Sequence, residues 1–338
     1  MFQIIFLGSL SGKTSIKKVI FDKIPPYEIE LNKQVNKEYQ CQLYSFGYCK
    51  LSIIEFPSSF YFENNIQEYE QYLSKCNALV FIMDYKLPRE QQIEYFNKNV
   101  LPILNNYKSI SLYIFLHKID NYNTNSILQS QYNDEAKQIK SQIWQQIYSN
   151  YESDKFKNNF FITSIFDTTL IEAFSAILQN MIPQNTNLSF LLEKFSKKCG
   201  VENAYIFDIN NKFCLAKFIY LKKNTEIMFE LCVNMIDFVV EMAHIYDENE
   251  DKMIDSDDDN FDEDMEYELE IKNLKNGIPD SKSIIFFYYV FHNMALIYIV
   301  NKDTFEKNRN SFECNVNILK NSKKKTKIFL IIIILRII

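Results

Sequence analysis

The most constraining feature of this sequence is a short glycine-containing loop near its start. Residues 8–15 read Gly-Ser-Leu-Ser-Gly-Lys-Thr-Ser, and they hold two of the five glycines in the 338 residues. An apolar run at residues 1–6 precedes the loop, and an amphipathic run at residues 16–21 follows it. A strand, a glycine-containing turn ending in Gly-Lys-Thr and a helix form the layout of a phosphate-binding P-loop. The sequence therefore predicts a phosphate site at the start of a helix.

The residues of this predicted P-loop have separate chemical tasks. Successive backbone N–H groups would form a concave anion site at the positive end of the helix. The Lys13 ammonium would contact the β- and γ-phosphates, and the Thr14 hydroxyl would coordinate Mg²⁺. Only three residues separate the two glycines, one fewer than in the usual motif, so the loop is short. The nucleotide-binding residues expected here are Gly8, Ser11, Gly12, Lys13, Thr14 and Ser15.

Charge and cysteine content limit the partners and the cellular compartment that are expected for this protein. A net charge of −6 and a pI of about 5.4 leave no basic excess to displace counterions, so nucleic acid is not an expected partner. The seven cysteines form no C-x-x-C pair and no metal-like spacing with the three histidines. Such a pattern is typical of reduced thiols in the cytoplasm. Residue 1 leads straight into an apolar run, and no signal peptide is expected.

Residues 1–182 alternate short apolar runs with longer amphipathic segments. This alternation predicts an α/β fold, a mostly parallel sheet with helices on both faces, in which ligands bind beyond the carboxyl ends of the strands. The expected strands, apolar enough to be buried on both faces, are residues 4–7, 51–54, 78–83, 112–116 and 159–162. The expected helices include residues 66–74, 91–105 and 134–149.

A break at residues 183–187 marks a predicted domain boundary, and a different element order follows it. A helix, a strand pair, a second helix and three more strands over residues 183–320 predict a small α/β sensor or dimerisation domain. Its acidic stretch, residues 247–268, is expected to be a solvated loop. Residues 321–338 form a basic and apolar tail whose apolar part is shorter than the ~20 residues that span a bilayer. The tail is expected to be a packed strand or a loose chain end, with peripheral membrane association as the alternative.

A second motif follows the strand expected at residues 112–116. His117-Lys118-Ile-Asp120 fits the guanine-reading pattern, in which a carboxylate accepts hydrogen bonds from both N1–H and the N2 amine of guanine. The Asp120 carboxylate would therefore select the base, and the Lys118 stem would pack along the purine. Downstream of the last expected strand, Ser164 and Ile165 would contact the guanine edge.

The segments that would sense the γ-phosphate depart from the usual pattern. Glu55-Phe-Pro-Ser58-Ser59 stands where D-x-x-G-Q is expected, so Glu55 and Ser59 are degenerate switch II positions. Val35 stands where a switch I Thr would close over Mg²⁺, and Val has no oxygen ligand. Asp84 is either a carboxylate on the Mg²⁺ side or a turn-capping residue. These departures predict weak or absent hydrolysis.

This string of motifs resembles the Rag GTPases, specifically their C/D branch. Phe166 and the cysteine-containing helix of the second domain look more like C/D than A/B members. The similarity extends over about residues 2–315. The matching segments are residues 11–21, 55–57, 117–120, 163–175, 182–184, 200–208 and 230–237.

The resemblance implies a Ras-like G domain followed by a roadblock (longin-like) domain that forms a heterodimer with an A/B-type Rag GTPase. It implies binding of GTP or GDP with Mg²⁺, and a role in relaying amino-acid status to the TOR kinase complex. It also implies an indirect, peripheral position at the lysosomal or vacuolar surface, reached through a scaffold complex. The short P-loop favours an alternative, a nucleotide-free pseudo-GTPase that acts only as a dimerisation scaffold. A third hypothesis is a P-loop ATPase or small-molecule kinase that uses Asp84.

Overall fold

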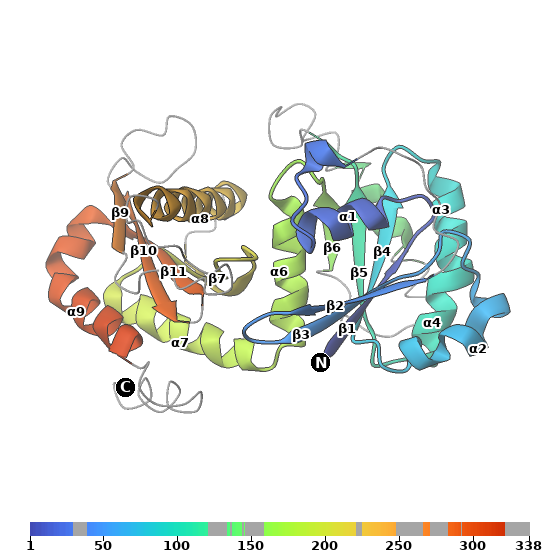
Figure 1. Cartoon of the computed structure of the whole chain (residues 1–338), viewed down its shortest axis with the longest axis horizontal. Coiled ribbons are helices and arrows are strands. Elements are labelled where there is room, and N and C mark those ends of the chain that lie inside the picture. The colour runs from blue at the N-terminus through green and yellow to red at the C-terminus, as the bar shows by residue number, and fades with distance from the viewer. Residues whose placement is uncertain are drawn as a thin grey trace. The chain divides into compact units, whose positions relative to one another are not determined.

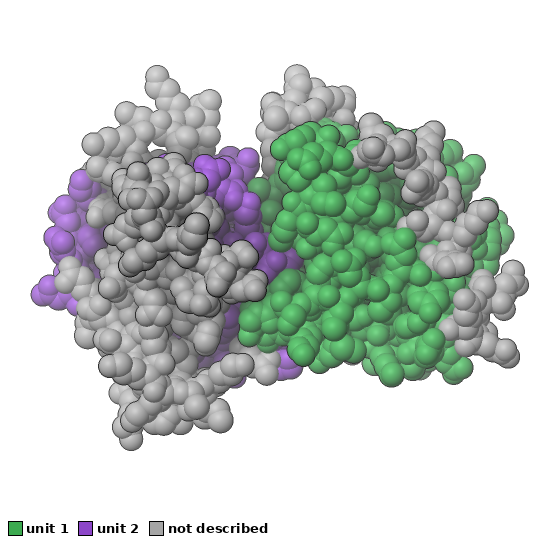
Figure 2. All heavy atoms as spheres, viewed as in Figure 1, with its two compact units in different colours: residues 1–177 green, residues 178–338 purple. Residues whose placement is uncertain are grey.

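The chain forms two compact units, residues 1–177 and 178–338, coloured separately in Figure 2. The division falls close to the predicted boundary after residue 182, which stays a prediction. The computed structural model describes residues 1–29, 39–120, 134–135, 137–143, 145, 159–220, 225–247, 266–270, 283–291 and 293–321. The predictions for Val35, for most of the acidic stretch and for the tail from residue 322 lie outside the described residues.

The first unit is built on a six-stranded sheet in the order β2-β3-β1-β4-β5-β6 (Figure 1). Its neighbouring strands are parallel except for β2 and β3, which are antiparallel. The predicted mostly parallel sheet is thus confirmed, whereas the edge strand β2 was not predicted. The strands are β1 (Phe2–Leu7), β2 (Gln40–Ser45), β3 (Lys50–Glu55), β4 (Ala78–Asp84), β5 (Ser111–His117) and β6 (Phe160–Thr163).

The helix predicted over residues 91–105 is divided into three parts. A π-helical turn, η2 (Phe96–Val100), separates α3 (Arg89–Tyr95) from α4 (Leu101–Asn106). Pro102 follows the turn, and because proline has no N–H it breaks the regular hydrogen-bond ladder at this point. The other described helices of the unit are α1 (Lys13–Ile20), the short η1 (Pro26–Glu28), α2 (Phe62–Leu73), a helical stretch at residues 137–143, and the larger part of α6 (Thr169–Met181), which continues past residue 177.

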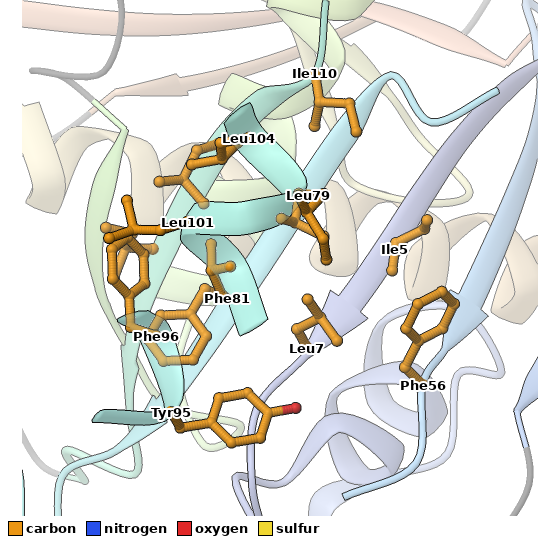
Figure 3. Packing of buried hydrophobic residues seen from close by; sticks show 14 of the residues in the cluster. Ile5, Leu7, Phe56, Leu79, Phe81, Tyr95, Phe96, Leu101, Leu104 and Ile110 are labelled. Atoms are coloured by element: carbon orange, nitrogen blue, oxygen red, sulfur yellow. The ribbon is translucent and has the colours of Figure 1, made fainter. Parts of the chain in front are cut away.

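Helices cover both faces of this sheet. Alternate residues of each central strand point to opposite sides, so each strand contributes side chains to the packing on both faces. On one face, Leu7 and Phe81 pack with Phe96 and other side chains of the α2–α4 segment (Figure 3). On the other face, Phe6 lies 5.9 Å from the ring of Phe174 on α6. Burial on both faces explains why these strands read as continuous apolar runs.

The second unit contains a five-stranded antiparallel sheet in the order β8-β7-β11-β10-β9. Helices α7 and α9 pack on one face of it, and the Phe207 ring lies 5.5 Å from that of Phe229 on α8. The elements are α7 (Gln184–Cys199), β7 (Asn203–Asp208), β8 (Cys214–Ile219), α8 (Thr225–Asp247), β9 (Glu266–Glu270), β10 (Ser283–Phe291), β11 (Met294–Asn301) and α9 (Lys302–Asn321).

Two helices of this unit differ from the prediction. Helix α7 begins at Gln184, inside the break predicted at residues 183–187, with Pro183 at its N-cap. Gly200 ends it in the left-handed region, with φ 71°, a conformation that glycine adopts readily at the end of a helix. Helix α9 was not predicted. Within the described part of the chain, the helices lack the combination of length and apolarity needed to cross a bilayer.

Candidate nucleotide-binding site

The predicted site residues follow the carboxyl ends of the parallel strands of the first unit. Strand register pairs Asp84 at the end of β4 with His117 at the end of β5, and His117 with Thr163 at the end of β6. Leu7 ends β1, and Glu55 ends β3. The loops after these strands therefore meet at one edge of the sheet, where such folds bind ligands.

The loop after β1 has a backbone that requires glycine at two points. Gly8 adopts φ +144°, and a Cβ there would lie 2.2 Å from the Ile82 carbonyl oxygen. Gly12, the N-cap of α1, adopts φ 88°. Between them the exposed Leu10 also adopts a positive φ of 52°, which is unusual for a leucine, and Ser11 is buried. The short loop thus closes with a strained residue at its tip.

Lys13, the first residue of α1, is buried inside this loop. Its ammonium donates a hydrogen bond to the Gly8 carbonyl and lies 3.4 Å from the Ser58 hydroxyl oxygen. Burial lowers the pKa of Lys13 to about 8, and the charge of Glu55 acts in the opposite direction. The Ser58 oxygen also accepts a 3.5 Å hydrogen bond from the Leu10 N–H. The segment after β3 therefore contacts the P-loop directly.

A second corner of the site joins α1 to the end of β3. The Thr14 hydroxyl donates a 2.5 Å hydrogen bond to Glu55 Oε1, and Ser15 beside it is half-buried. Lys17, one turn further along α1, places its ammonium 3.9 Å from Glu55 Oε2 and donates to Gln40 Oε1 at 2.7 Å. Hydroxyl and carboxylate oxygens are hard ligands of the kind that Mg²⁺ prefers. The donors at this corner thus fit Mg²⁺ in type, and Thr14 and Glu55 would hold it.

At the other end of the site, Asp120 is held by two side chains. Its Oδ1 accepts a 2.8 Å hydrogen bond from the Ser164 hydroxyl, and its Oδ2 lies 3.4 Å from the Lys86 ammonium. The Ser164 N–H donates to the Thr169 hydroxyl at 3.0 Å, which fixes the loop after β6. Ile165 is half-buried beside it. The contact between Asp120 and Ser164 joins the two segments that were predicted to read guanine.

Lys118 connects this end of the site to the P-loop. Its ammonium lies 2.5 Å from Asp84 Oδ2 and 3.4 Å from the Leu10 carbonyl oxygen. Its Cε would lie 3.4 Å from a Cβ on Gly12. Asp84 Oδ1 accepts a 2.8 Å hydrogen bond from the Lys86 N–H, an arrangement typical of a turn-capping aspartate. These contacts support the turn-capping alternative for Asp84.

His117 is buried next to the P-loop. Its Nδ1 is 3.0 Å from the Thr163 hydroxyl oxygen, and its Cδ2 would lie 3.2 Å from a Cβ on Gly12. Burial and then the charge of Lys118 lower the pKa of His117 to about 4, so the imidazole is neutral at pH 7. In this position His117 supports the P-loop from the sheet side.

Sequence reasoning missed three polar residues of the site: Lys17, Lys86 and Thr163. A signal for Lys17 was available, because residues four apart on a helix share one face and Lys13 lies in the P-loop. Lys86 and Thr163 carried no comparable signal. Ser59, the predicted switch II position, is exposed to solvent.

The sequence is similar to a family of G proteins and to several of its members. Residues 3–236 match the Gtr1/RagA G protein conserved region. The chain is 28% identical over 248 residues to the Ras-related GTP-binding protein C of Homo sapiens, an alignment that covers 71% of this chain and 58% of that protein. It is 27% identical over 323 residues to the GTP-binding protein gtr2 of Schizosaccharomyces pombe, covering 94% and 95% of the two chains. The Ras-related GTP-binding protein A of Dictyostelium discoideum is 24% identical over 214 residues, covering 61% and 66%.

Proposed function

Because the chain belongs to the Gtr1/RagA family of G proteins and is similar to its C/D-type members, we propose that it binds GTP or GDP as one subunit of a Rag heterodimer. The observation that carries this proposal is the continuous set of contacts from Ser164 to the P-loop. Asp120 contacts both Ser164 and Lys86, and the Lys86 N–H donates to Asp84. Lys118 then joins Asp84 to the Leu10 carbonyl of the P-loop. A base-reading carboxylate and a phosphate loop are thereby joined in one site.

In this proposal the two ends of the site have different ligands. The Asp120 carboxylate accepts hydrogen bonds from N1–H and the N2 amine of guanine, a pair of donors that adenine lacks. Lys13 leaves the Gly8 carbonyl and binds phosphate oxygens, while the N–H groups at the start of α1 complete the anion site. Thr14 and Glu55 would hold Mg²⁺, which would neutralise charge on the phosphates when bound.

We further propose that hydrolysis is weak or absent. Ser59 is exposed and short where a water-positioning residue is expected, and Ser58 replaces the glycine whose N–H would approach the γ-phosphate. A single-turnover measurement on GTP-loaded protein tests this: turnover well above the intrinsic rate of its relatives would contradict it. Replacement of Ser59 by Gln is the corresponding attempt to restore a water-positioning side chain.

The proposed partner is an A/B-type Rag GTPase, bound through a roadblock-type second domain. Ile227 and Phe238 on α8 are 44% and 45% exposed, and apolar side chains exposed on one helix support a docking surface there. Within this proposal the heterodimer relays amino-acid status to the TOR kinase complex. It does so while held indirectly, through a scaffold complex, at the lysosomal or vacuolar surface.

The alternative function, a nucleotide-free scaffold, is favoured by two observations. Leu10 is strained at the tip of the short loop, and the Lys13 ammonium is already bonded to the Gly8 carbonyl. The two functions are separated by extracting the purified heterodimer and identifying any released nucleotide by ion-exchange chromatography. The first function predicts guanine nucleotide on this chain that is lost after Lys13→Ala. The scaffold function predicts the same nucleotide content with and without the substitution.

A further inference from the structure

Helix α1 carries a second lysine that faces the same corner as the phosphate-binding one. Lys17 follows Lys13 by one helical turn, so both side chains leave the helix on one face. Side chains on a helix lean toward its N-terminus, and this direction brings the Lys17 ammonium back toward the P-loop. It ends 3.9 Å from Oε2 of Glu55, whose other oxygen receives the Thr14 hydroxyl bond.

Three elements hold the Lys17 ammonium in this place. The side chain rises from α1, Gln40 of β2 accepts its hydrogen bond at 2.7 Å, and Glu55 of β3 supplies the opposite charge. Lys17 and Glu55 are 6% and 3% exposed. A buried ammonium is costly unless it is paired, and a buried carboxylate equally so. The pair is therefore a fixed part of the site.

The charges at this corner determine how phosphates would be received. A carboxylate beside a phosphate site repels the phosphate unless a cation lies close to both. At many P-loops a divalent cation fills that role. Here two buried ammonium groups, Lys13 and Lys17, accompany one carboxylate, Glu55, so the corner is positive before any metal binds.

We propose that Lys17 neutralises Glu55 at the phosphate site and thereby makes guanine-nucleotide binding by this chain only weakly dependent on Mg²⁺. Mg²⁺ can still bind at Thr14 and Glu55, but it increases nucleotide affinity less because the Glu55 carboxylate is already paired with Lys17. The inference rests on the proposed nucleotide binding, and it concerns affinity rather than hydrolysis.

The test compares the Kd of a fluorescent GDP analogue in excess Mg²⁺ with its Kd in EDTA. The full-length chain is used in complex with its A/B-type partner, whose own P-loop lysine is replaced by alanine in every sample. We expect the ratio of the two Kd values to stay below about tenfold, since tenfold is the effect of losing one typical charge-assisted hydrogen bond.

Three variants assign the effect to the charge pair. Lys17→Gln should raise the ratio by at least about tenfold, chiefly by weakening binding in EDTA, because the Glu55 charge is then unpaired. Lys18→Gln removes the same charge from the adjacent, less buried position, and should leave the ratio unchanged. The double variant Lys17→Gln/Glu55→Gln removes both charges and should return the ratio toward that of the unmodified chain.

The possible outcomes are distinct. No nucleotide binding in either buffer would overturn both the proposed function and this inference. Binding with a ratio above tenfold in the unmodified chain would overturn the inference alone, as would equal ratios for Lys17→Gln and Lys18→Gln. Circular dichroism and thermal unfolding establish that each variant is folded. Should Lys17→Gln not fold, Glu55→Gln replaces it, with an expected ratio close to one; a ratio at or above that of the unmodified chain overturns the inference.

Discussion

Acidification should destabilise the first unit through His117, whose imidazole is buried in neutral form. Burial is the main cause of its lowered pKa, and the Lys118 charge adds to it, while Asp120 and Asp84 act in the opposite direction. The unfolded chain binds a proton at this histidine near its ordinary pKa, whereas the folded chain does so only near pH 4. Between these values the unfolded state binds more protons, so the free energy of unfolding falls as the pH falls.

The size of the effect follows from the two pKa values. The full contribution is about 3 kcal/mol, present above the unfolded pKa of 6.5 and lost as the pH falls toward 4. Between pH 7.5 and pH 5 the expected loss is about 2 kcal/mol. Single domains have total stabilities of about 5–15 kcal/mol, so a loss of this size is measurable.

The assay is urea unfolding followed by the fluorescence of Trp144, the single tryptophan of the sequence. Each measurement is made at pH 7.5 and pH 5, without added nucleotide, on the unmodified chain and on His117→Asn. The asparagine side chain can still hydrogen-bond to Thr163 but cannot take up a proton. The difference between the two proteins cancels the titration of all other groups. If that difference is the same at both pH values, the reasoning about His117 is refuted.

Three further substitutions test other parts of the structure. Gly8→Ala should cost about 3 kcal/mol of unfolding free energy, seen in the same urea assay, because its Cβ would lie 2.2 Å from the Ile82 carbonyl oxygen at φ +144°. An unchanged stability would contradict the backbone described for the P-loop. Asp120→Asn should weaken GDP binding by at least about tenfold and favour xanthosine diphosphate, measured by competition, because an amide donates where the carboxylate accepted. Equal loss of both nucleotides would argue against a base-reading role. Gly200→Ala should cost about 1 kcal/mol in thermal unfolding of the second unit, since φ is +71° and the Cβ would lie 2.9 Å from Thr304 Cγ2.

The sequence predicted those parts of the fold that are buried and therefore rich in apolar residues. The four central strands of the first unit, β1, β3, β4 and β5, are buried on both faces and read as continuous apolar runs. The edge strand β6 is mostly half-buried but is apolar in sequence, so it was predicted as well. Strand β2 was missed because nearly all of its side chains are exposed, so its sequence holds no continuous apolar run. Helix α9 was missed because its described buried residues are few and its sequence is largely polar. It is held by packing against the sheet and α7, through residues such as Phe305 and Phe312.

In the candidate site, the sequence predicted which loops lie close together but not the side-chain contacts that join them. The glycines, Lys13 and Asp120 were predicted as site residues because a P-loop and a base-reading carboxylate require those residue types at set positions. The contacts of Lys17 and Lys118 depend on long side chains that reach partners on other strands, and no local pattern reports such partners. The positive φ of Leu10 likewise follows from closing the short loop between two fixed elements.

The position of Lys118 bears on how a chain of this kind changes over generations. Lys118 joins the P-loop to β4 through the Leu10 carbonyl and Asp84, and neither contact involves residues 55–59. Selection for hydrolysis would therefore constrain residues 55–59. Selection for a folded pocket would instead constrain Lys118 and Asp84. A lineage that drifts in the first set while keeping the second can lose a reaction and still inherit the shape that its partners recognise.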